Sequence, residues 1–420
     1  MQKKIEIDKT HLIVFLGTMN AMPMMYAWEL KKLGYKILYF VDRPQSDALS
    51  RPENHFPDIS YPYPDWIIEF PLRTQIALPY FRKFYASKIK RIIHKICKDS
   101  VQLYVLNGFF SSIAKFLEKD ARKIALAHGS DVDSWADIEG IPSLVKSFQK
   151  KSIFKFLPFF ISKKLIPLAV RRQYEGITHC NAVAYFPHGF NKSGDRVLDN
   201  LEKNGVDCLE RYDVSFEPLK TQNREFKQPG HKLVVFSGVR FMFKTFSEGN
   251  DGYAKGNDLI IEGLARFYKE NPLIEVHFVE KGPDVDEAKK LCVANGLAPA
   301  VTWHKEMKFN QLLALYSKSD ICFDQVGEHW IGAIGCYALW LGKPLIANDE
   351  LAVRYGIWPE NNPVCSAKNS DEVYTELKKL SYISKRKEVS LKSTQFADEY
   401  LSPAKFLQCT FTFISNSKHE

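Results

Sequence analysis

Several patterns that would indicate a function at once are absent from this sequence of 420 residues. The eight cysteines are scattered singly, with no Cys-x-x-Cys pair and no His/Cys cluster at the spacing of a zinc site. There is no Gly-x-Gly-x-x-Gly fingerprint of dinucleotide binding and no Gly-x-Ser-x-Gly motif of a serine nucleophile. These absences remove support for a zinc domain, a dinucleotide fingerprint and covalent catalysis by a serine.

Long apolar runs are also absent, whereas a transmembrane helix needs about 20 consecutive apolar residues. The first residues, MQKKIEIDKTHLIVFLG, place lysines before an apolar run as a signal peptide does. Thr18 and Pro23 interrupt that run, however, and no small-x-small cleavage site follows. Cys292, Cys322 and Cys336 lie in apolar stretches, where a reduced thiol is the natural state. We therefore expect a cytoplasmic protein, associated at most with the inner face of the membrane.

Positive charge is plentiful, with a net charge of +9 and a pI near 8.9, and suggests an anionic partner. We expect no nucleic-acid partner, because no nucleic-acid-binding motif is present. Phosphorylated small molecules and an anionic membrane surface fit the charge equally well. The stretch Lys150–Lys164 (KKSIFKFLPFFISKK) interleaves five lysines with four phenylalanines, which is typical of peripheral membrane contact. A helix with one core face and solvated lysines, interrupted at Pro158, would explain the same pattern.

Strand-like and helix-like segments alternate along the chain, which is typical of the α/β class. The segments expected to be strands are Leu12–Leu16, Tyr35–Val41, Trp66–Phe70, Val101–Leu106, Lys123–Ala127, Asn181–Phe186, Leu233–Phe236, Ile274–Val279, Val301–His304, Asp320–Phe323 and Leu345–Asn348. The segments expected to be helices are Met24–Leu33, Tyr80–Lys98, Phe109–Leu117, Leu259–Tyr268, a stretch ending near Ala294, Asn310–Ser317, Cys336–Leu341 and Asp371–Leu380.

A polar stretch at Glu217–Lys232 contains two prolines and has no apolar period, which predicts a linker between two domains. The first domain is then expected at 1–216 and the second at 233–395, both of ordinary domain size. We expect Phe396–Phe413, within the remaining 396–420, to form a final helix that crosses back onto the first domain.

The stretch Ser319–Asn348 is the clearest candidate for a ligand site. It reads as a strand, a loop with three glycines at Gly327–Gly335, a buried helix and a second strand, which together make a βαβ unit. The N-terminus of such a helix has unsatisfied N–H groups and a partial positive charge, and therefore suits a phosphate. Alternatively, these glycines only let the helix pack closely on the sheet.

Polar residues follow other expected strands as well. Arg240 and Lys255 come after the strand at 233–236, and the carboxyl ends of parallel strands share one sheet edge, where ligands bind. Two cations beside a helix N-terminus would hold a diphosphate and stabilise the charge of a diphosphate leaving group. His128 and Asp131 follow the strand at 123–127, and a histidine there can donate a hydrogen bond or take a proton. The alternative is a structural histidine bonded to Asp131.

In order and spacing these segments resemble the retaining GT-B glycosyltransferases of the family 4 type. The matching segments are SGVR…KGNDLIIEGLARF, VHFVEKGPD, VTWHKEM…LLALYSKSDICFDQ and ALWLGKPLIA. The resemblance covers the whole second half, and covers the first half only through the glycine loop after the first strand and HGSD. It implies a GT-B fold, in which two Rossmann-like domains face each other across a cleft. The second domain would bind the nucleotide sugar, and the first would bind the acceptor.

The resemblance also implies roles for individual residues. Arg240 and Lys255 would hold the donor diphosphate, which Gly17 would approach from the other domain. His128 would contact the donor sugar near the reacting centre, and backbone groups around Lys305–Met307 would hold the base. Further donor-binding candidates are Asp131, Lys244, Gly282, Gly332, Gly335 and Tyr337.

Two features depart from the family pattern. The family usually carries two glutamates eight residues apart, and Tyr337 stands at the position of the second. Eight residues before it is His329, so a shift of one residue would let Glu328 serve as the first glutamate and a catalytic residue. The insertion FMFKTFSEGNDGYA between the two cations is longer than usual, so Lys244 competes for the diphosphate.

The activity implied is transfer of a sugar from a nucleoside diphosphate, UDP favoured, to a glycan or lipid-linked acceptor in cell-envelope polysaccharide synthesis. With retention, the leaving diphosphate oxygen helps to deprotonate the acceptor hydroxyl, so the mechanism requires no protein nucleophile, metal or other cofactor. Two alternatives stay open. One is an inverting GT-B transferase or a sugar-nucleotide epimerase, with Asp131 or Asp133 as base. The other is a non-catalytic sugar-nucleotide-binding subunit, which the replaced glutamate would favour.

Overall fold

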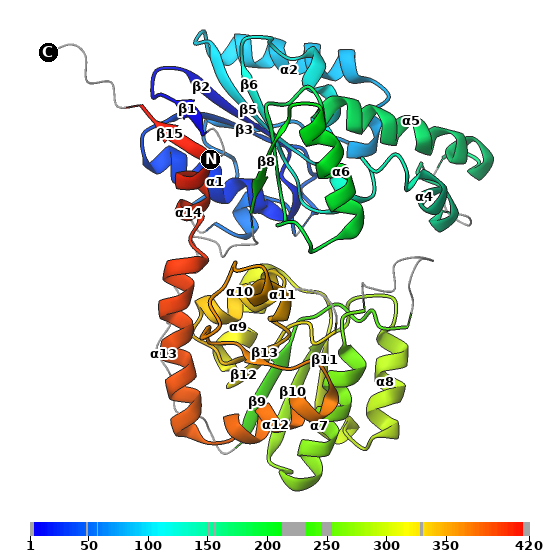
Figure 1. Ribbon diagram of the computed structural model, residues 1–420, viewed down its shortest axis with the longest axis vertical. Coiled ribbons are helices and arrows are strands. Elements are labelled where there is room, and N and C mark those ends of the chain that lie inside the picture. The colour runs from blue at the N-terminus through cyan, green and yellow to red at the C-terminus, as the bar shows by residue number, and fades with distance from the viewer. Residues whose placement is uncertain are drawn as a thin grey trace, which may run out of the picture. The chain divides into compact units, whose positions relative to one another are not determined.

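The computed structural model describes residues 4–47, 49–56, 58–148, 152–154, 156–211, 232–244, 254–327 and 331–414. The chain forms two compact units (Figure 1). Unit 1 comprises Met1–Tyr212 with Pro403–Glu420, and unit 2 comprises Asp213–Ser402. The predicted linker at 217–232 lies outside the described residues, apart from Lys232. No helix of the described residues is long and apolar enough to cross a membrane.

Unit 1 is built on a parallel sheet that has seven strands in the described part of the chain, in the order β4-β3-β2-β5-β6-β7-β8. The strands are β2 (Leu12–Leu16), β3 (Lys36–Val41), β4 (Ile67–Glu69), β5 (Val101–Asn107), β6 (Arg122–Leu126), β7 (Ala182–Tyr185) and β8 (Asp207–Glu210). The helices are α1 (Met22–Lys32), α2 (Arg82–Ile96), α3 (Ser130–Asp133), α4 (Ile141–Ser147), α5 (Phe159–Ile177) and α6 (Lys192–Lys203). The segment expected as a helix at 109–117 is instead the 3₁₀ helix η4 (Gly108–Phe116).

Unit 2 repeats this plan with six strands among its described residues, in the order β11-β10-β9-β12-β13-β14, all parallel. The strands are β9 (Leu233–Ser237), β10 (Ile274–Val279), β11 (Val301–His304), β12 (Ile321–Phe323), β13 (Leu345–Ala347) and β14 (Cys365–Ser366). The helices are α7 (Asn257–Glu270), α8 (Val285–Ala294), α9 (Phe309–Lys318), α10 (Ala333–Trp340), α11 (Glu350–Arg354), α12 (Ser370–Leu380) and α13 (Ile383–Tyr400).

The strand order fixes where each unit can bind a ligand. Counted from the first strand of each sheet, both orders begin 3-2-1-4-5-6, which is the order of the Rossmann fold. The direction of winding reverses beside the first strand, and ligands bind outside the carboxyl ends of the strands at this switch point. In unit 1 the switch point lies at the end of β2, and in unit 2 it lies at the end of β9.

The segment Phe396–Phe413 is not the single helix expected. Helix α13 ends at Tyr400, and a second helix, α14 (Pro403–Thr410), is followed by strand β15 (Phe411–Phe413). Pro403 explains the break, because proline disfavours the helical conformation in the residue before it but suits the first turn of a new helix. Strand β15 pairs in parallel with β1 (Ile5–Ile7), so α14 and β15 complete unit 1, whereas α13 belongs to unit 2.

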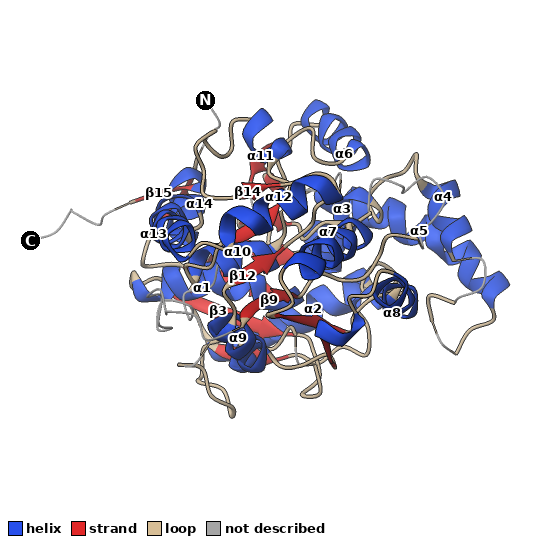
Figure 2. Cartoon of the chain, turned by 90° about the horizontal axis from the view of Figure 1, so that it is seen from below, coloured by secondary structure: helices blue, strands red, loops and turns tan. Residues whose placement is uncertain are grey.

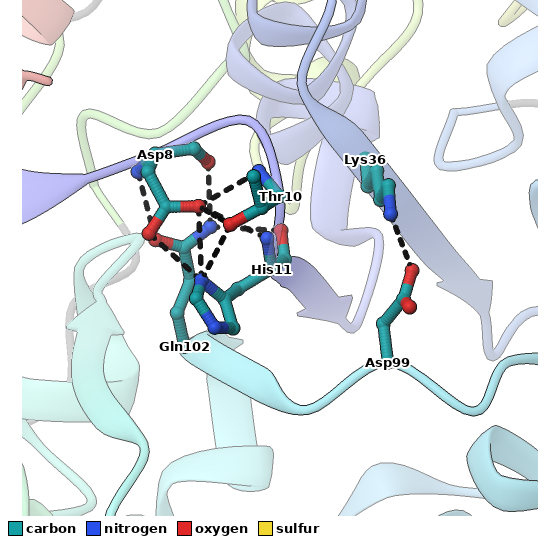
Figure 3. Close-up of polar contacts among 6 residues, drawn as sticks. All are labelled: Asp8, Thr10, His11, Lys36, Asp99 and Gln102. Atoms are coloured by element: carbon teal, nitrogen blue, oxygen red, sulfur yellow. Dashed lines mark hydrogen bonds and ion pairs between the residues drawn. The ribbon is translucent and has the colours of Figure 1, made fainter. Parts of the chain in front are cut away.

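Strand β1 is tied to the large sheet of unit 1 through the turn that follows it. The Gln102 side chain accepts the N–H of Asp8 at 2.9 Å and donates to the carbonyl oxygens of Asp8 and His11 at 2.8 Å (Figure 3). The Asp8 carboxylate accepts the backbone N–H groups of Thr10 and His11. The small β1–β15 sheet is therefore anchored to β5, which carries Gln102.

Candidate functional site

Three cationic side chains come together at the switch point of unit 2. Arg240 follows β9, Lys281 follows β10, and Lys255 lies just before α7. Burial lowers the pKa of Lys255 to about 8; Asp324 opposes the shift and Arg240 adds to it. Burial also lowers the pKa of Lys281, again opposed by a carboxylate, that of Glu306, and reinforced by Arg240. The protein thus holds partly desolvated cations near one another, an arrangement that an anionic ligand would stabilise.

The loop that carries Arg240 is fixed by groups of this chain. The buried Asp284 carboxylate accepts the successive N–H groups of Phe243 and Lys244 at 2.7 and 2.8 Å. Gly282 has φ +114°, and a Cβ there would lie 2.2 Å from the carbonyl oxygen of Phe241. Only glycine fits such a close approach at positive φ. Gly282, predicted to bind the donor, therefore serves at least to bring the loops after β9 and β10 together.

Two further predicted donor contacts lie at the surface in ion pairs. Lys244 Nζ lies 2.7 Å from a Glu287 carboxylate oxygen, and Lys305 pairs with Glu280. Exposed pairs of this kind contribute little net free energy, so both lysines can exchange these partners for a ligand. Met307, on the same loop as Lys305, is half-buried.

The N-terminus of α10 is capped by a carboxylate of this chain. Asp324 Oδ2 accepts the N–H groups of Gly332 and Gly335 at 2.6 and 3.0 Å. The side chain is 1% exposed, and burial raises its pKa to about 6. The neighbouring Gln325 accepts a hydrogen bond from Lys255 Nζ at 2.7 Å. The two glycines predicted to offer N–H groups to a phosphate thus donate them to Asp324, and the cations remain as the principal anion-binding groups.

The two glutamate positions of the family have different surroundings here. Tyr337 is buried, and its ring packs edge-on against that of Phe309 with centroids 5.2 Å apart. Glu328 lies outside the described residues. Gly327, directly before it, packs backbone to backbone against Gly256. A Cβ on Gly256 would stand only 2.4 Å from Gly327 N, so this close approach requires glycine at position 256. Gly327, the last described residue before Glu328, therefore lies beside the loop that carries Lys255.

The switch point of unit 1 carries a strained loop. After β2, Gly17 (φ +95°), Asn20 (φ +52°) and Ala21 (φ +55°) all adopt positive φ. A Cβ on Gly17 would lie 2.8 Å from the carbonyl oxygen of Asn107, so this position requires glycine. Asn20 Nδ2 lies 2.6 Å from Nε2 of His128. Left-handed conformation in non-glycine residues is uncommon and concentrates at functional sites.

The HGSD segment follows β6, at the same edge of the sheet. The buried Asp131 carboxylate accepts the backbone N–H groups of His128 and Gly129 at 2.8 and 2.9 Å. Asp131 thereby shapes the loop through the backbone, while the imidazole ring meets Asn20. With the Asn20 amide nitrogen as donor, His128 Nε2 accepts this hydrogen bond.

Asp133, the alternative base, belongs to a buried polar group. The Tyr185 hydroxyl donates to its Oδ2 at 2.9 Å, and Ser134 donates to its Oδ1. Burial raises the pKa of Asp133 to about 6, against the effect of these hydrogen bonds. Among the residues that the structure describes, no three His, Cys, Asp or Glu side chains gather as metal ligands would.

Comparisons with known proteins identify the fold. No protein-family model matches the sequence, and no curated protein matches it. Sucrose-phosphate synthase from Thermosynechococcus elongatus matches with a TM-score of 0.57 at 11% identity, over 95% of this chain and 96% of that one. A glycosyltransferase from Rickettsia africae ESF-5 matches with a TM-score of 0.55 at 13% identity, over 95% and 96%. The chain has the GT-B fold.

The GT-B fold is also found in a protein described as a UDP-N-acetylglucosamine 2-epimerase from Listeria monocytogenes. It matches with a TM-score of 0.54 at 12% identity, over 97% of this chain and 100% of that one. The predicted α/β class with two Rossmann-like domains is confirmed, as is the GT-B resemblance at the level of the fold. Because transferases and an epimerase share this fold, the reaction must be argued from the site.

Sequence reasoning missed Lys281, Asp324 and Asn20. Lys281 and Asp324 come within two residues of the ends of β10 and β12, the signal that singled out Arg240. Position alone could therefore have found them. The contact of Asn20 joins residues 108 apart in the sequence, and no local pattern indicates it.

Proposed function

We propose that the protein is a glycosyltransferase that takes a sugar from a nucleoside diphosphate donor, UDP favoured, and transfers it with retention of configuration. The acceptor is a glycan or a lipid-linked intermediate of the cell envelope. The observation that carries the proposal is the cluster of Arg240, Lys255 and Lys281 at the switch point of unit 2. An open α/β sheet binds its ligands at this edge.

The charges of this cluster favour a diphosphate. Asp324 is the carboxylate that opposes the pKa shift of Lys255, and it is already engaged by α10. A diphosphate would supply the missing negative charge and raise the pKa of Lys255 back towards its ordinary value. Arg240 can donate hydrogen bonds to two phosphate oxygens at once, whereas each lysine acts as a point charge. The same groups would stabilise the charge that develops as the nucleoside diphosphate leaves.

The transfer step requires no protein nucleophile. The bond between the anomeric carbon and the β-phosphate oxygen breaks as the acceptor oxygen bonds to the same carbon, and the acceptor proton passes to the leaving phosphate oxygen. In this proposal Gly17 leaves room for the donor, Asp131 shapes the loop of His128, and His128 contacts the donor sugar. Glu328 holds the sugar from unit 2, and the loop at Lys305–Met307 holds the base.

A sugar-nucleotide epimerase is the second candidate, favoured by the match to the Listeria protein over nearly the whole of both chains. The same cations would bind its nucleotide, so binding alone does not separate the two activities. Release of the nucleoside diphosphate in the presence of an acceptor supports the transferase. Conversion of the sugar on an intact nucleotide supports the epimerase.

Thermal unfolding with a panel of nucleoside diphosphates and nucleotide sugars tests the site. A ligand at 100 times its Kd stabilises a protein by about 2.7 kcal/mol, which is a shift of several degrees. We expect this shift in the wild type and its loss in Arg240→Ala. Arg266→Ala is the matched control, because Arg266 is an exposed arginine of unit 2 that pairs with Asp371 on α12. A flat response of the wild type across the panel would contradict the proposal.

A further inference from the structure

Unit 1 exposes four phenylalanine side chains from two segments that are far apart in sequence. Phe81 and Phe84 lie at the start of α2, and Phe156 and Phe160 lie at the start of α5. Their exposed fractions run from 59% to 66%, and Phe413 (36%) is the one other exposed phenylalanine among the described residues. Exposed apolar rings of this kind are typical of a surface that a partner covers.

The two segments pack against each other. The Tyr80 ring lies 5.6 Å from the Phe154 ring, centroid to centroid, and the Tyr80 hydroxyl donates to the carbonyl oxygen of Leu165 at 2.8 Å. The Phe154 ring in turn contacts that of Phe156 at 5.7 Å. Helix α4 and the first part of α5 project from the rest of unit 1 in both views (Figures 1 and 2). We call the exposed side chains of residues 81–88 and 156–168 the α2–α5 face.

Basic residues predominate around the α2–α5 face, where Glu175 pairs with Arg82 at 2.7 Å and with Lys115 at 2.9 Å. Residues 73–98 and 141–174 each contain eight lysines and arginines, and neither stretch contains an aspartate or glutamate. Lys83, Lys163 and Lys164 are exposed among the rings. Lys150, Lys151 and Lys155 of the predicted segment at 150–164 lie outside the described residues and are not part of this face.

Helix α5 packs against the rest of unit 1 along one face, and its other face is exposed. Ile166, Ala169 and Val170 are buried, whereas Ile161 and Leu168 are exposed on the same helix. These exposed aliphatic side chains decide between anionic partners. A nucleic acid offers stacking surfaces to aromatic rings but nothing to an exposed isoleucine or leucine, whereas the acyl region of a bilayer accepts both kinds of side chain.

We propose that the α2–α5 face docks unit 1 onto an anionic lipid surface. Rings and aliphatic groups enter the interface between headgroups and acyl chains, and the interleaved lysines remain at the level of the phosphates. Each lysine or arginine near such a surface contributes about 1 kcal/mol, and the attraction is screened by salt. The docking does not depend on the proposed transferase activity.

Vesicle co-sedimentation of the full-length protein tests this docking. We expect binding to vesicles of equal parts phosphatidylglycerol and phosphatidylcholine, weakened by high salt, and little binding to phosphatidylcholine alone. The double variant Phe81→Ser/Phe160→Ser should bind at least tenfold more weakly. Its matched control is Leu273→Ser/Leu391→Ser, which removes apolar side chains 64% and 62% exposed in unit 2 and should bind as the wild type does.

A charge variant separates the contributions of the face. Lys83→Glu/Lys163→Glu should lose binding to phosphatidylglycerol vesicles, while an unchanged Tm shows that the fold is intact. Equal loss in the phenylalanine variant and its control, or no wild-type binding to phosphatidylglycerol, would overturn the proposal. So would tight binding of an RNA or DNA oligonucleotide that needs the lysines but not the phenylalanines. None of these readouts uses a nucleotide sugar, so the transferase proposal stands or falls separately.

Discussion

The substitution Asp324→Asn removes a buried negative charge with almost no change of shape. Asp324 is 1% exposed, and burial raises the pKa of its carboxyl group to about 6 although Gly332 and Gly335 donate to it. The rise of this pKa from 3.8 to about 6 corresponds to about 3 kcal/mol between the charged and neutral forms of the carboxyl group. An uncharged amide, whose oxygen can still accept the two N–H groups, should recover most of this free energy at neutral pH.

The pH dependence follows from the direction of the shift. The folded state binds the proton of Asp324 more tightly than the unfolded state does, because the folded pKa is the higher one. The contribution of this group to stability is therefore fully present below about pH 4 and is lost as the pH rises through about 6. Wild type and Asp324→Asn should have similar free energies of unfolding near pH 4 and differ by about 3 kcal/mol above pH 7. For a unit of this size the difference corresponds to an increase in Tm of about 6–12 °C.

Urea unfolding followed by tryptophan fluorescence at a series of pH values measures this difference. Asp371→Asn is the matched control, because Asp371 pairs with Arg266 at the surface of the same unit and should leave stability nearly unchanged at every pH. A lower stability of Asp324→Asn than of the wild type at neutral pH would contradict this expectation. The carboxylate would then stabilise α10 and Lys255 by more than its burial destabilises the folded state.

Two further predictions concern the cations and the histidine. The affinity for UDP should fall as the pH rises above about 8, because burial lowers the pKa of Lys255 to about 8 and the neutral amine no longer attracts phosphate. Calorimetric titrations near neutral pH and near pH 9 measure the fall, which Lys255→Arg should abolish. Asn20→Asp places a carboxylate beside His128 Nε2 and should favour the protonated imidazole, because an opposite charge nearby favours the charged form. The pH profile of kcat/KM should then shift upwards, whereas a purely structural role for Asn20 would lower kcat/KM without moving the profile.

The buried strands are the part of the fold that the sequence predicts best. β2 at Leu12–Leu16 and β10 at Ile274–Val279 are largely buried and occur at the expected bounds, and so does the edge strand β11 at Val301–His304. Strands covered by helices on both faces are apolar along most of their length and are therefore easy to recognise. The edge strand β8 was not predicted, because Asp207–Glu210 has one buried residue among exposed and half-buried ones. Pro403, which divides α13 from α14, is a sequence signal against one continuous helix over 396–413.

The candidate site could be predicted only as far as single residues at strand ends. Arg240 and Lys255 were found in this way, because parallel strands bring their carboxyl ends to one edge. The hydrogen-bond partners of Lys255 and His128 could not be predicted in this way, because Gln325 lies 70 residues from Lys255 and Asn20 lies 108 residues from His128. Such contacts depend on the strand order of the finished sheet. The sequence also could not predict that Asp324 caps α10, because a carboxylate and a phosphate suit a helix N-terminus equally well.

The pairing of β1 with β15 sets the order in which the protein can be completed during synthesis. Unit 2 is one uninterrupted stretch, Asp213–Ser402, whereas unit 1 is divided between residues before and after it. At about 5–20 residues per second, a ribosome needs about 10–40 s to pass through the stretch that separates the two parts. During that time β1 lacks its partner strand and Tyr26 of α1 lacks the ring of Phe406, which it contacts at 4.7 Å. The unit that lies second in the sequence is therefore the first whose residues are all available to fold.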